Sequence, residues 1–223
     1  MMPSRPALRG CILFAVVTAV CFNASLSYGQ TTTAPATASV KLPAGYPPNL
    51  AAGKMELRDP DGTEILSFKP RPPASLTVRN GQNQEIGRFT LSEGRLKAAG
   101  PDGAARFELK RKDDKVMLKD ASGEQELFKF KLKGQDVDFY APGDKLLYRL
   151  RHKDYGYALE DAHDKTLFRA KTKDDKRVLR DLSDKTVLYS KDLQQPLGLI
   201  FFRIPQLDPL QQAACCVFFQ QTR

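Results

Sequence analysis

The chain has 223 residues, of which 41% are hydrophobic and 27% charged, and it carries a formal charge of +9. Without the N-terminal segment described next, about 190 residues remain, enough for one domain with its own core rather than two. Of the four cysteines, only Cys215 and Cys216 lie outside that segment. Adjacent cysteines do not form the well-separated pairs of a disulfide framework, so a disulfide scaffold is excluded.

Residues 1–29 have the pattern of a secretory signal peptide. Arg5 and Arg9 give a positive start, an apolar run at 11–22 follows, and small residues precede a cleavage site before Gln30. The run is shorter than the ~20 residues that span a bilayer, which disfavours the alternative of an uncleaved anchor. We therefore expect an exported protein, whether periplasmic, in the cell envelope or secreted, without a transmembrane span after cleavage.

Residues 30–54 are rich in Thr, Ala and Pro and predict a flexible linker. A single domain is expected over 55–223. Cleavage after Gly29 removes two arginines and no acidic residue, so the formal charge falls from +9 to +7.

From Met55 to Lys191 one pattern occurs seven times: an apolar run, a polar turn, another apolar run and a basic turn. A steady period of about 20 residues indicates one supersecondary unit copied in tandem. The first turns of the copies align, in steps of 20 or 21 residues, at Asp59, Asn80, Gly100, Asp120, Ala141, Asp161 and Asp181.

Each copy predicts a β-hairpin. In the copy from Val116 to Asp136, phenylalanine and lysine alternate, which places the aromatic side chains on one sheet face and the lysines on the other. Asp, Asn and Gly recur in the first turns because they tolerate or brace left-handed backbone conformations. The second turns are predicted to be longer and basic, as at 110–115 and 171–176.

Two strands in each of seven copies predict about fourteen strands without helices between them. An open meander of that length would leave its edges exposed. Propeller repeats are about twice as long as this period, at ~40–50 residues. The favoured fold is therefore all-β, an antiparallel β-barrel or closed meander of tandem hairpins.

The C-terminal residues depart from the repeat. The run from Leu197 to Ile204 is apolar except for Arg203 and is predicted to be a strand buried on both faces. Asp208 then stands at an N-cap position and Gln211 three residues later, which is a capping-box arrangement.

A helix is therefore predicted at about 209–220, with Pro209 at its first position. Its middle is apolar on all sides, which is typical of a helix buried in a protein core. We expect this helix to fill the barrel, with Cys215 and Cys216 as two buried thiols.

Tandem hairpins with Asp-x-x-Gly-like turns and an apolar terminal helix resemble the tubby-like barrel superfamily, which includes tubby C-terminal domains, phospholipid scramblases and LURP-one-related proteins. The matching pieces are Arg58 to Gly62, Lys119 to Gly123 and the helix from Asp208 to Phe219, and the resemblance covers Met55 to Phe219. It implies a twelve-stranded barrel around a hydrophobic C-terminal helix. The repeats and the additional strand exceed twelve strands, and known members are mostly intracellular.

A catalytic or metal site is not expected. The only histidines, His152 and His163, have no third ligand at the spacing that a zinc site requires. No nucleophile elbow, phosphate-binding loop or dinucleotide fingerprint is present. The acidic pairs at 113–114 and 174–175 are flanked by lysines, which keep carboxylates ionised, so they are interpreted as solvated turns. We predict a protein that is not an enzyme and needs no cofactor.

Basic residues concentrate in the middle copies. An outward-facing group of them could attract anionic lipid headgroups or acidic polysaccharide, whereas nucleic acid is disfavoured because the phenylalanines face away from the lysines. The alternative is an envelope scaffold that docks a protein partner and uses its charge only for solubility. We expect a monomer. The candidate contacts are Lys110, Arg111, Lys112, Lys129, Lys131, Lys133, Arg149, Arg151 and Lys153.

Overall fold

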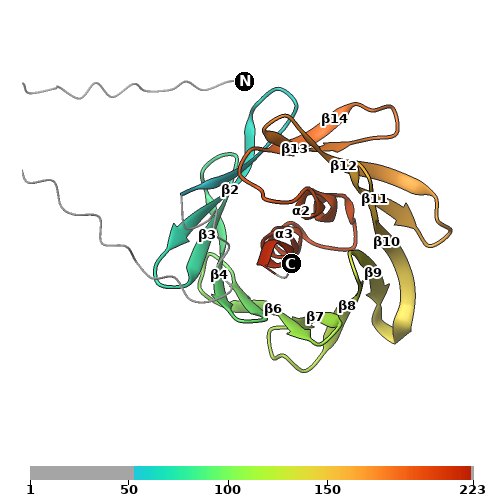
Figure 1. Cartoon of the computed structure of the whole chain (residues 1–223). Coiled ribbons are helices and arrows are strands. Elements are labelled where there is room, and N and C mark those ends of the chain that lie inside the picture. The colour runs from blue at the N-terminus through green and yellow to red at the C-terminus, as the bar shows by residue number, and fades with distance from the viewer. Residues whose placement is uncertain (1–52, 222–223) are drawn as a thin grey trace, which may run out of the picture. The chain divides into compact units, whose positions relative to one another are not determined.

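Fourteen antiparallel strands form a closed barrel in the structure, a computed structural model that describes residues 53–221 (Figure 1). Each strand pairs with its neighbours in the sequence, and β1 pairs with β14 to close the circle. The strands are β1 (Met55–Arg58), β2 (Glu64–Arg71), β3 (Ser75–Asn80), β4 (Glu85–Ser92), β5 (Arg95–Ala99), β6 (Ala105–Lys112), β7 (Lys115–Asp120), β8 (Glu126–Lys133), β9 (Asp136–Ala141), β10 (Lys145–Lys153), β11 (Gly156–Asp161), β12 (Thr166–Lys173), β13 (Lys176–Arg180) and β14 (Thr186–Ser190), with a 3-10 turn η1 (Pro142–Asp144).

The all-β barrel of tandem hairpins is thus confirmed, with two strands per repeat. Its fourteen strands agree with the repeat and exceed the twelve that the family resemblance implies. The predicted signal peptide lies outside the described residues, as does the linker except for Gly53 and Lys54. Within the described residues, no helix is both long and apolar enough to cross a membrane.

The first turns have one geometry, which explains their composition. The backbone N–H of the fourth turn residue donates to the carbonyl of the first, as from Gly62 to Asp59 and from Asp164 to Asp161. That fourth residue has a positive φ in every copy, and Gly, Asn and Asp adopt this conformation at the lowest cost. The seven residues are Gly62, Asn83, Gly103, Gly123, Asp144, Asp164 and Asp184.

The second turns differ from the prediction, because they are shorter than the first turns. Two residues connect β6 to β7 at Asp113–Asp114 and β12 to β13 at Asp174–Asp175. Asp113 and Asp174 have positive φ angles of 55° and 53°, and this backbone conformation is found in tight hairpin loops. The flanking lysines therefore belong to the strands.

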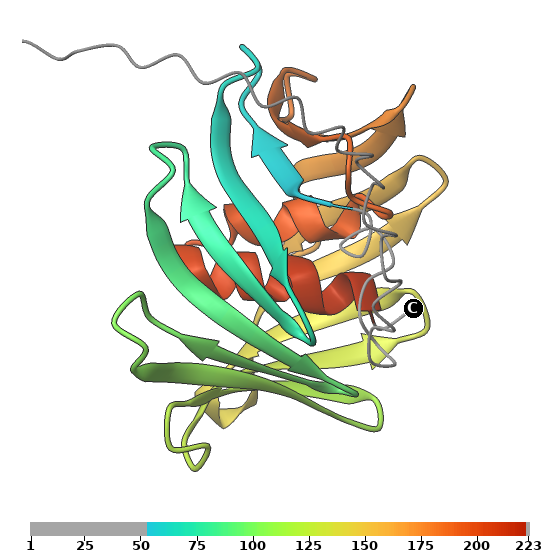
Figure 2. The same ribbon diagram turned by 90° about the vertical axis from the view of Figure 1, so that its left-hand side faces the viewer.

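The lumen is filled by helices, as Figure 2 shows. Residues 197–204 do not form the predicted strand. They form α2 (Leu197–Ile200) followed by the 3-10 turn η2 (Phe201–Arg203). The closed barrel leaves no free edge inside it, so an inserted segment must satisfy its backbone hydrogen bonds locally, which a helix does and a single strand cannot. An apolar run alone does not distinguish the two.

The predicted terminal helix is confirmed as α3 (Pro209–Gln221). Its capping box is present: the Gln211 N–H donates to Asp208 Oδ1 at 2.8 Å, and the Asp208 N–H donates to Gln211 Oε1 at 3.1 Å. Residues 213–220 are buried. Cys215 and Cys216 are free buried thiols, as predicted, and burial raises the pKa of both, so neither is poised for thiolate chemistry.

An aromatic cluster joins the barrel wall to the helices inside it. The Phe130 ring of β8 lies 4.8 Å from Phe139 of β9, 5.3 Å from Phe219 of α3 and 5.9 Å from Phe201 of η2. Phe201 and Phe219 are 4.8 Å apart. At α2, a Cβ on Gly198 would lie 3.0 Å from Cys216 Sγ, so glycine permits the close approach of the two helices.

Candidate functional site

The nine predicted contact residues come from three strands: Lys110, Arg111 and Lys112 from β6, Lys129, Lys131 and Lys133 from β8, and Arg149, Arg151 and Lys153 from β10. The hairpin architecture places these strands on one side of the barrel, separated by β7 and β9 (Figure 1). The inward orientation of the phenylalanines is also as predicted. Phe130 is buried, and Phe128 packs with Phe139 at a ring distance of 5.1 Å.

The basic residues of β8 and β10 are in ion pairs. Lys129 contacts Asp144, and Arg149 contacts Asp164. Lys153 Nζ lies 3.2 Å from Glu160 Oε1. These partners were not predicted from the sequence, although two of the pairs share a spacing of 15 residues, which joins a strand to the residue of positive φ in the next first turn.

Asp138 of β9 is the most buried of these acids, with 2% of its side chain exposed. Lys133 Nζ lies 2.6 Å from its Oδ2, and Arg151 Nη1 lies 3.0 Å from its Oδ1 without hydrogen-bond geometry. Burial alone would raise the pKa of Asp138, but the Lys133 hydrogen bond and the Arg151 charge outweigh it, so the pKa lies below its ordinary value. Lys133 and Arg151 therefore neutralise the Asp138 carboxylate.

Three lysines lie opposite one another across β6, β7 and β8. Lys112 of β6 lies directly opposite Lys115 of β7, and Lys115 lies directly opposite Lys131 of β8. We call Lys112, Lys115 and Lys131 the lysine row. Lys112 and Lys115 are exposed and form no ion pair in the part of the chain that the structure describes, whereas Lys131 lies 3.9 Å from Asp144 and 4.7 Å from the Tyr140 ring.

The surface beside the lysine row is hollowed. A depression of about 370 Å³ is lined by three lysines, Lys112, Lys115 and Lys129, together with Met117 and three acidic residues, Asp113, Asp114 and Glu126. Lys110 and Arg111 lie on the same strand as Lys112, and Arg111 Nε donates to the Asp113 carbonyl at 3.2 Å. The β6–β8 surface is thus a concave face that carries both lysines and carboxylates, and Lys112 and Lys115 are the lysines on it that form no ion pair within the described residues.

A second hollow lies at the barrel end that carries the second turns. This mouth pocket of about 720 Å³ is lined by His152 and Tyr157, by Tyr155 and Gln135 from the turns, and by Gln195 before α2. Tyr155 is 42% exposed, and the His152 ring stands edge-on to Tyr157 at 5.1 Å. From the sequence, His152 is a candidate only for metal binding or catalysis, and no pocket is predicted beside it.

No group of three or more His, Cys, Asp or Glu side chains able to hold a metal ion occurs among residues 53–221. His163 is exposed, and its backbone N–H donates to Asp161 Oδ1 at 2.8 Å, so it is a residue of the first turn.

Comparisons with known proteins assign no family. No family model matches the chain, and no curated protein matches it. One solved structure, an X-ray structure of an Arabidopsis thaliana protein, is similar over 68% of this chain and 86% of the other, with 9% identity and a TM-score of 0.36. A likeness at this level carries no argument, so the resemblance to tubby-like barrels stays a prediction.

Proposed function

We propose that this protein is an exported, non-catalytic binding module whose lysine row, with the neighbouring Lys110 of β6, binds an anionic surface, with acidic polysaccharide as the favoured ligand. The lysine row is the observation that carries this proposal. Like charges directly opposite each other on neighbouring strands destabilise a sheet by about 0.2–1 kcal/mol per pair. Two such contacts in succession are best explained by a ligand that neutralises them.

The lining of the mouth pocket supports polysaccharide rather than a lipid bilayer as the ligand. Tyrosine rings and side-chain amides line the mouth pocket, and these groups can stack on sugar rings and bond to hydroxyl groups. The only large hydrophobic residues exposed among the described ones are Ile65, Tyr155 and Leu182, and they do not come from one turn. Such isolated residues offer little apolar area for insertion between lipids.

Binding to immobilised alginate and to neutral dextran tests the proposal, with vesicles of phosphatidylglycerol and phosphatidylcholine as the lipid arm. We expect retention on alginate that falls as salt rises from ~50 to ~500 mM, since exposed charges are screened. Stronger retention on the vesicles would replace polysaccharide by lipid headgroups. Salt-independent retention, or none on any polyanion, would contradict the proposal and favour the protein-docking alternative.

Lys115→Glu separates function from stability. The glutamate would face two lysines, so we expect the free energy of unfolding to rise by about 0.5 kcal/mol. Alginate affinity should fall about tenfold, equivalent to 1.4 kcal/mol. Lys165→Glu is the matched control, because Lys165 is exposed on a first turn at the other end of the barrel. Equal losses of affinity in both variants would show that only net charge matters.

A further inference from the structure

A third hollow lies on the outer wall across β2 and β3. This groove of about 570 Å³ is lined by Ser67, Lys69 and Arg79 together with Gly53, Lys54, Pro70, Pro72 and Asn83. Ser67 stands directly opposite Arg79, and Lys69 directly opposite Thr77. Since alternate residues of a strand share a face, the four side chains form one patch. We call Ser67, Lys69, Thr77 and Arg79 the donor cluster.

The donor cluster contains buried groups without partners. Ser67 is 1% exposed and Thr77 is fully buried. Neither Ser67 Oγ, Thr77 Oγ1 nor Arg79 Nε has a hydrogen-bond partner within the described residues. A buried polar group without a partner costs about 1–3 kcal/mol, and each one in a native structure requires an explanation.

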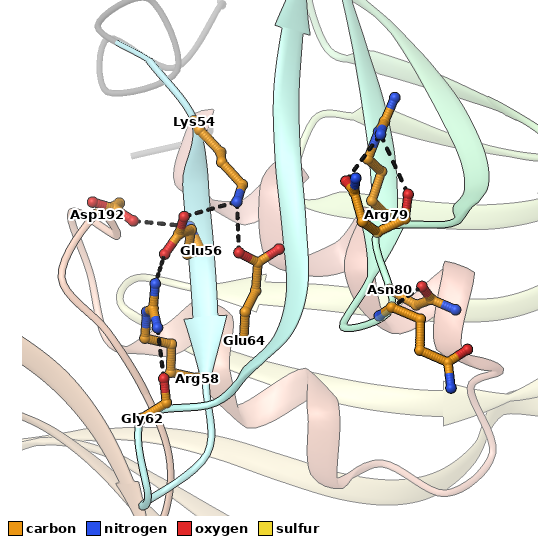
Figure 3. A network of polar contacts seen from close by, with 10 residues as sticks. Lys54, Glu56, Arg58, Gly62, Glu64, Arg79, Asn80 and Asp192 are labelled. Atoms are coloured by element: carbon orange, nitrogen blue, oxygen red, sulfur yellow. Dashed lines mark hydrogen bonds and ion pairs between the residues drawn. The ribbon is translucent and has the colours of Figure 1, made fainter.

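Neighbouring carboxylates do not satisfy these donors, because each is already in an ion pair. The Lys54 ammonium lies between two of them, 2.8 Å from Glu56 and 2.5 Å from Glu64 (Figure 3). Glu56 also contacts Arg58. These contacts lower the pKa of Glu56, with the Lys54 hydrogen bond as the largest cause, so it stays ionised and engaged. On the other side, Glu85 pairs with Arg88 at 2.5 Å.

Arg79 keeps its charge available. Its Nη1 donates to Asn83 Oδ1 at 2.9 Å and to the Asn83 carbonyl at 3.3 Å (Figure 3). Both acceptors belong to the adjacent first turn, so the guanidinium is oriented without being neutralised. No ion pair involves Arg79 or Lys69 within residues 53–221.

We infer that the donor cluster is a binding site for a tetrahedral oxyanion. This oxyanion would be the sulfate or phosphate ester group of a larger ligand. Lys69, Arg79 and Ser67 line one groove, the Thr77 hydroxyl belongs to the residue directly opposite Lys69, and each neighbouring carboxylate is already in an ion pair. Charge-assisted hydrogen bonds from an oriented guanidinium to an oxyanion are among the stronger ones in proteins. An oxyanion in the groove supplies the acceptors that Ser67, Thr77 and Arg79 lack.

Titration calorimetry of the purified protein with sodium sulfate and with sodium phosphate tests this site, using sodium chloride at equal ionic strength as the reference. We expect saturable binding of a tetrahedral oxyanion and none of chloride. Sulfate affinity should be constant between pH ~6 and ~8, whereas phosphate affinity should strengthen over this range as inorganic phosphate loses its second proton. The two arms thereby distinguish the sources of the group.

The double variant Ser67→Ala with Thr77→Val removes the hydroxyls and keeps the volume. Loss of two neutral hydrogen bonds should weaken oxyanion binding about tenfold. Without the ion, the variant should be at least as stable as the parent, because two unsatisfied groups are gone. Arg79→Gln should abolish binding, and Arg169→Gln, an exposed arginine of β12, should leave it unchanged.

Unchanged affinity in the double variant, an equal loss in Arg169→Gln, or absence of saturable binding to either oxyanion would overturn the assignment. The site is also independent of the lysine row, which lies on β6–β8 rather than β2–β3. Lys115→Glu should therefore leave oxyanion binding intact, and the double variant should leave alginate binding intact, so failure of one proposal does not imply failure of the other.

Discussion

Asp161 illustrates how single side chains stabilise the first turns. Its Oδ1 accepts the backbone N–H of Lys165 at 3.0 Å and that of His163 at 2.8 Å. Asp181 accepts the Lys185 N–H at 2.9 Å in the same way. A basic residue often precedes the turn and donates to the carbonyl of its fourth residue, as Arg180 does to Asp184 at 3.1 Å. Part of the basic charge therefore stabilises turns rather than awaiting a ligand.

The pH dependence of stability should report these bonds. The Lys165 N–H, followed by that of His163, lowers the pKa of Asp161 in the folded protein. The contribution of the Asp161 carboxylate to stability is therefore present above its ordinary pKa of about 3.9. It is lost as the pH falls through the lower pKa of the folded protein. Asp161→Asn keeps the acceptor but not the titration, so between pH ~4 and ~2 it should lose less stability than the parent. Chemical denaturation at each pH measures this, and parallel curves would contradict it.

At the scale of elements, α2 and α3 are joined by a buried amide. The Gln220 side chain is 4% exposed, and its Oε1 accepts the backbone N–H groups of Gln194 and Gln195 at 3.1 and 3.0 Å. Its Nε2 donates to the Gln195 carbonyl at 3.2 Å. One side chain at the end of α3 thus provides hydrogen-bond partners for the backbone groups that lead into α2. No neighbouring strand provides these partners.

Gln220→Met should therefore lower the free energy of unfolding by more than the change in side-chain polarity alone would do. The volume is conserved, but the backbone groups lose their partners, and an unsatisfied buried group costs about 1–3 kcal/mol. Gln82→Met is the control, because Gln82 is an exposed turn residue. Urea denaturation gives both values. A loss in Gln220→Met no larger than in the control would show that water replaces the amide.

The stability of the whole barrel depends on contact between its wall and the helices inside it. Phe130 of the wall, which packs against Phe139, makes edge-to-face contacts with Phe201 and Phe219 of the interior, so neither part has a complete core alone. Aromatic pairs contribute about 0.5–1.5 kcal/mol beyond the area that they bury. We infer that wall and helices unfold as one cooperative unit.

Phe219→Ala should destabilise the protein by about 3–5 kcal/mol, the usual cost of such a truncation in a core. Tyr155→Ala, at an exposed site, should change stability by less than about 0.5 kcal/mol. Far-ultraviolet and near-ultraviolet circular dichroism should report one coincident transition in the parent and in both variants. An earlier near-ultraviolet transition would show that the helices detach before the wall unfolds.

The candidate site could be predicted only in outline. The alternation in β8 correctly placed Lys129, Lys131 and Lys133 away from the phenylalanines. Strand register decides that these lysines pair with Asp144 and Asp138. It also decides that Lys112, Lys115 and Lys131 lie opposite one another. A bulge shifts the register beside each first turn, as between Leu118 and Lys119, and periodicity alone does not locate such bulges. The mouth pocket and the donor cluster combine side chains from several elements and have no linear motif.

The sequence by itself determined the hairpin repeat, the barrel class, the terminal helix and its cap, because period-two alternation, turn chemistry and capping act between residues close in the chain. Only the tertiary structure decided that 197–204 is helical, since the closed barrel leaves no edge for another strand. It also decided which cations are neutralised and which buried donors lack a partner, because both depend on side chains that meet only across neighbouring strands.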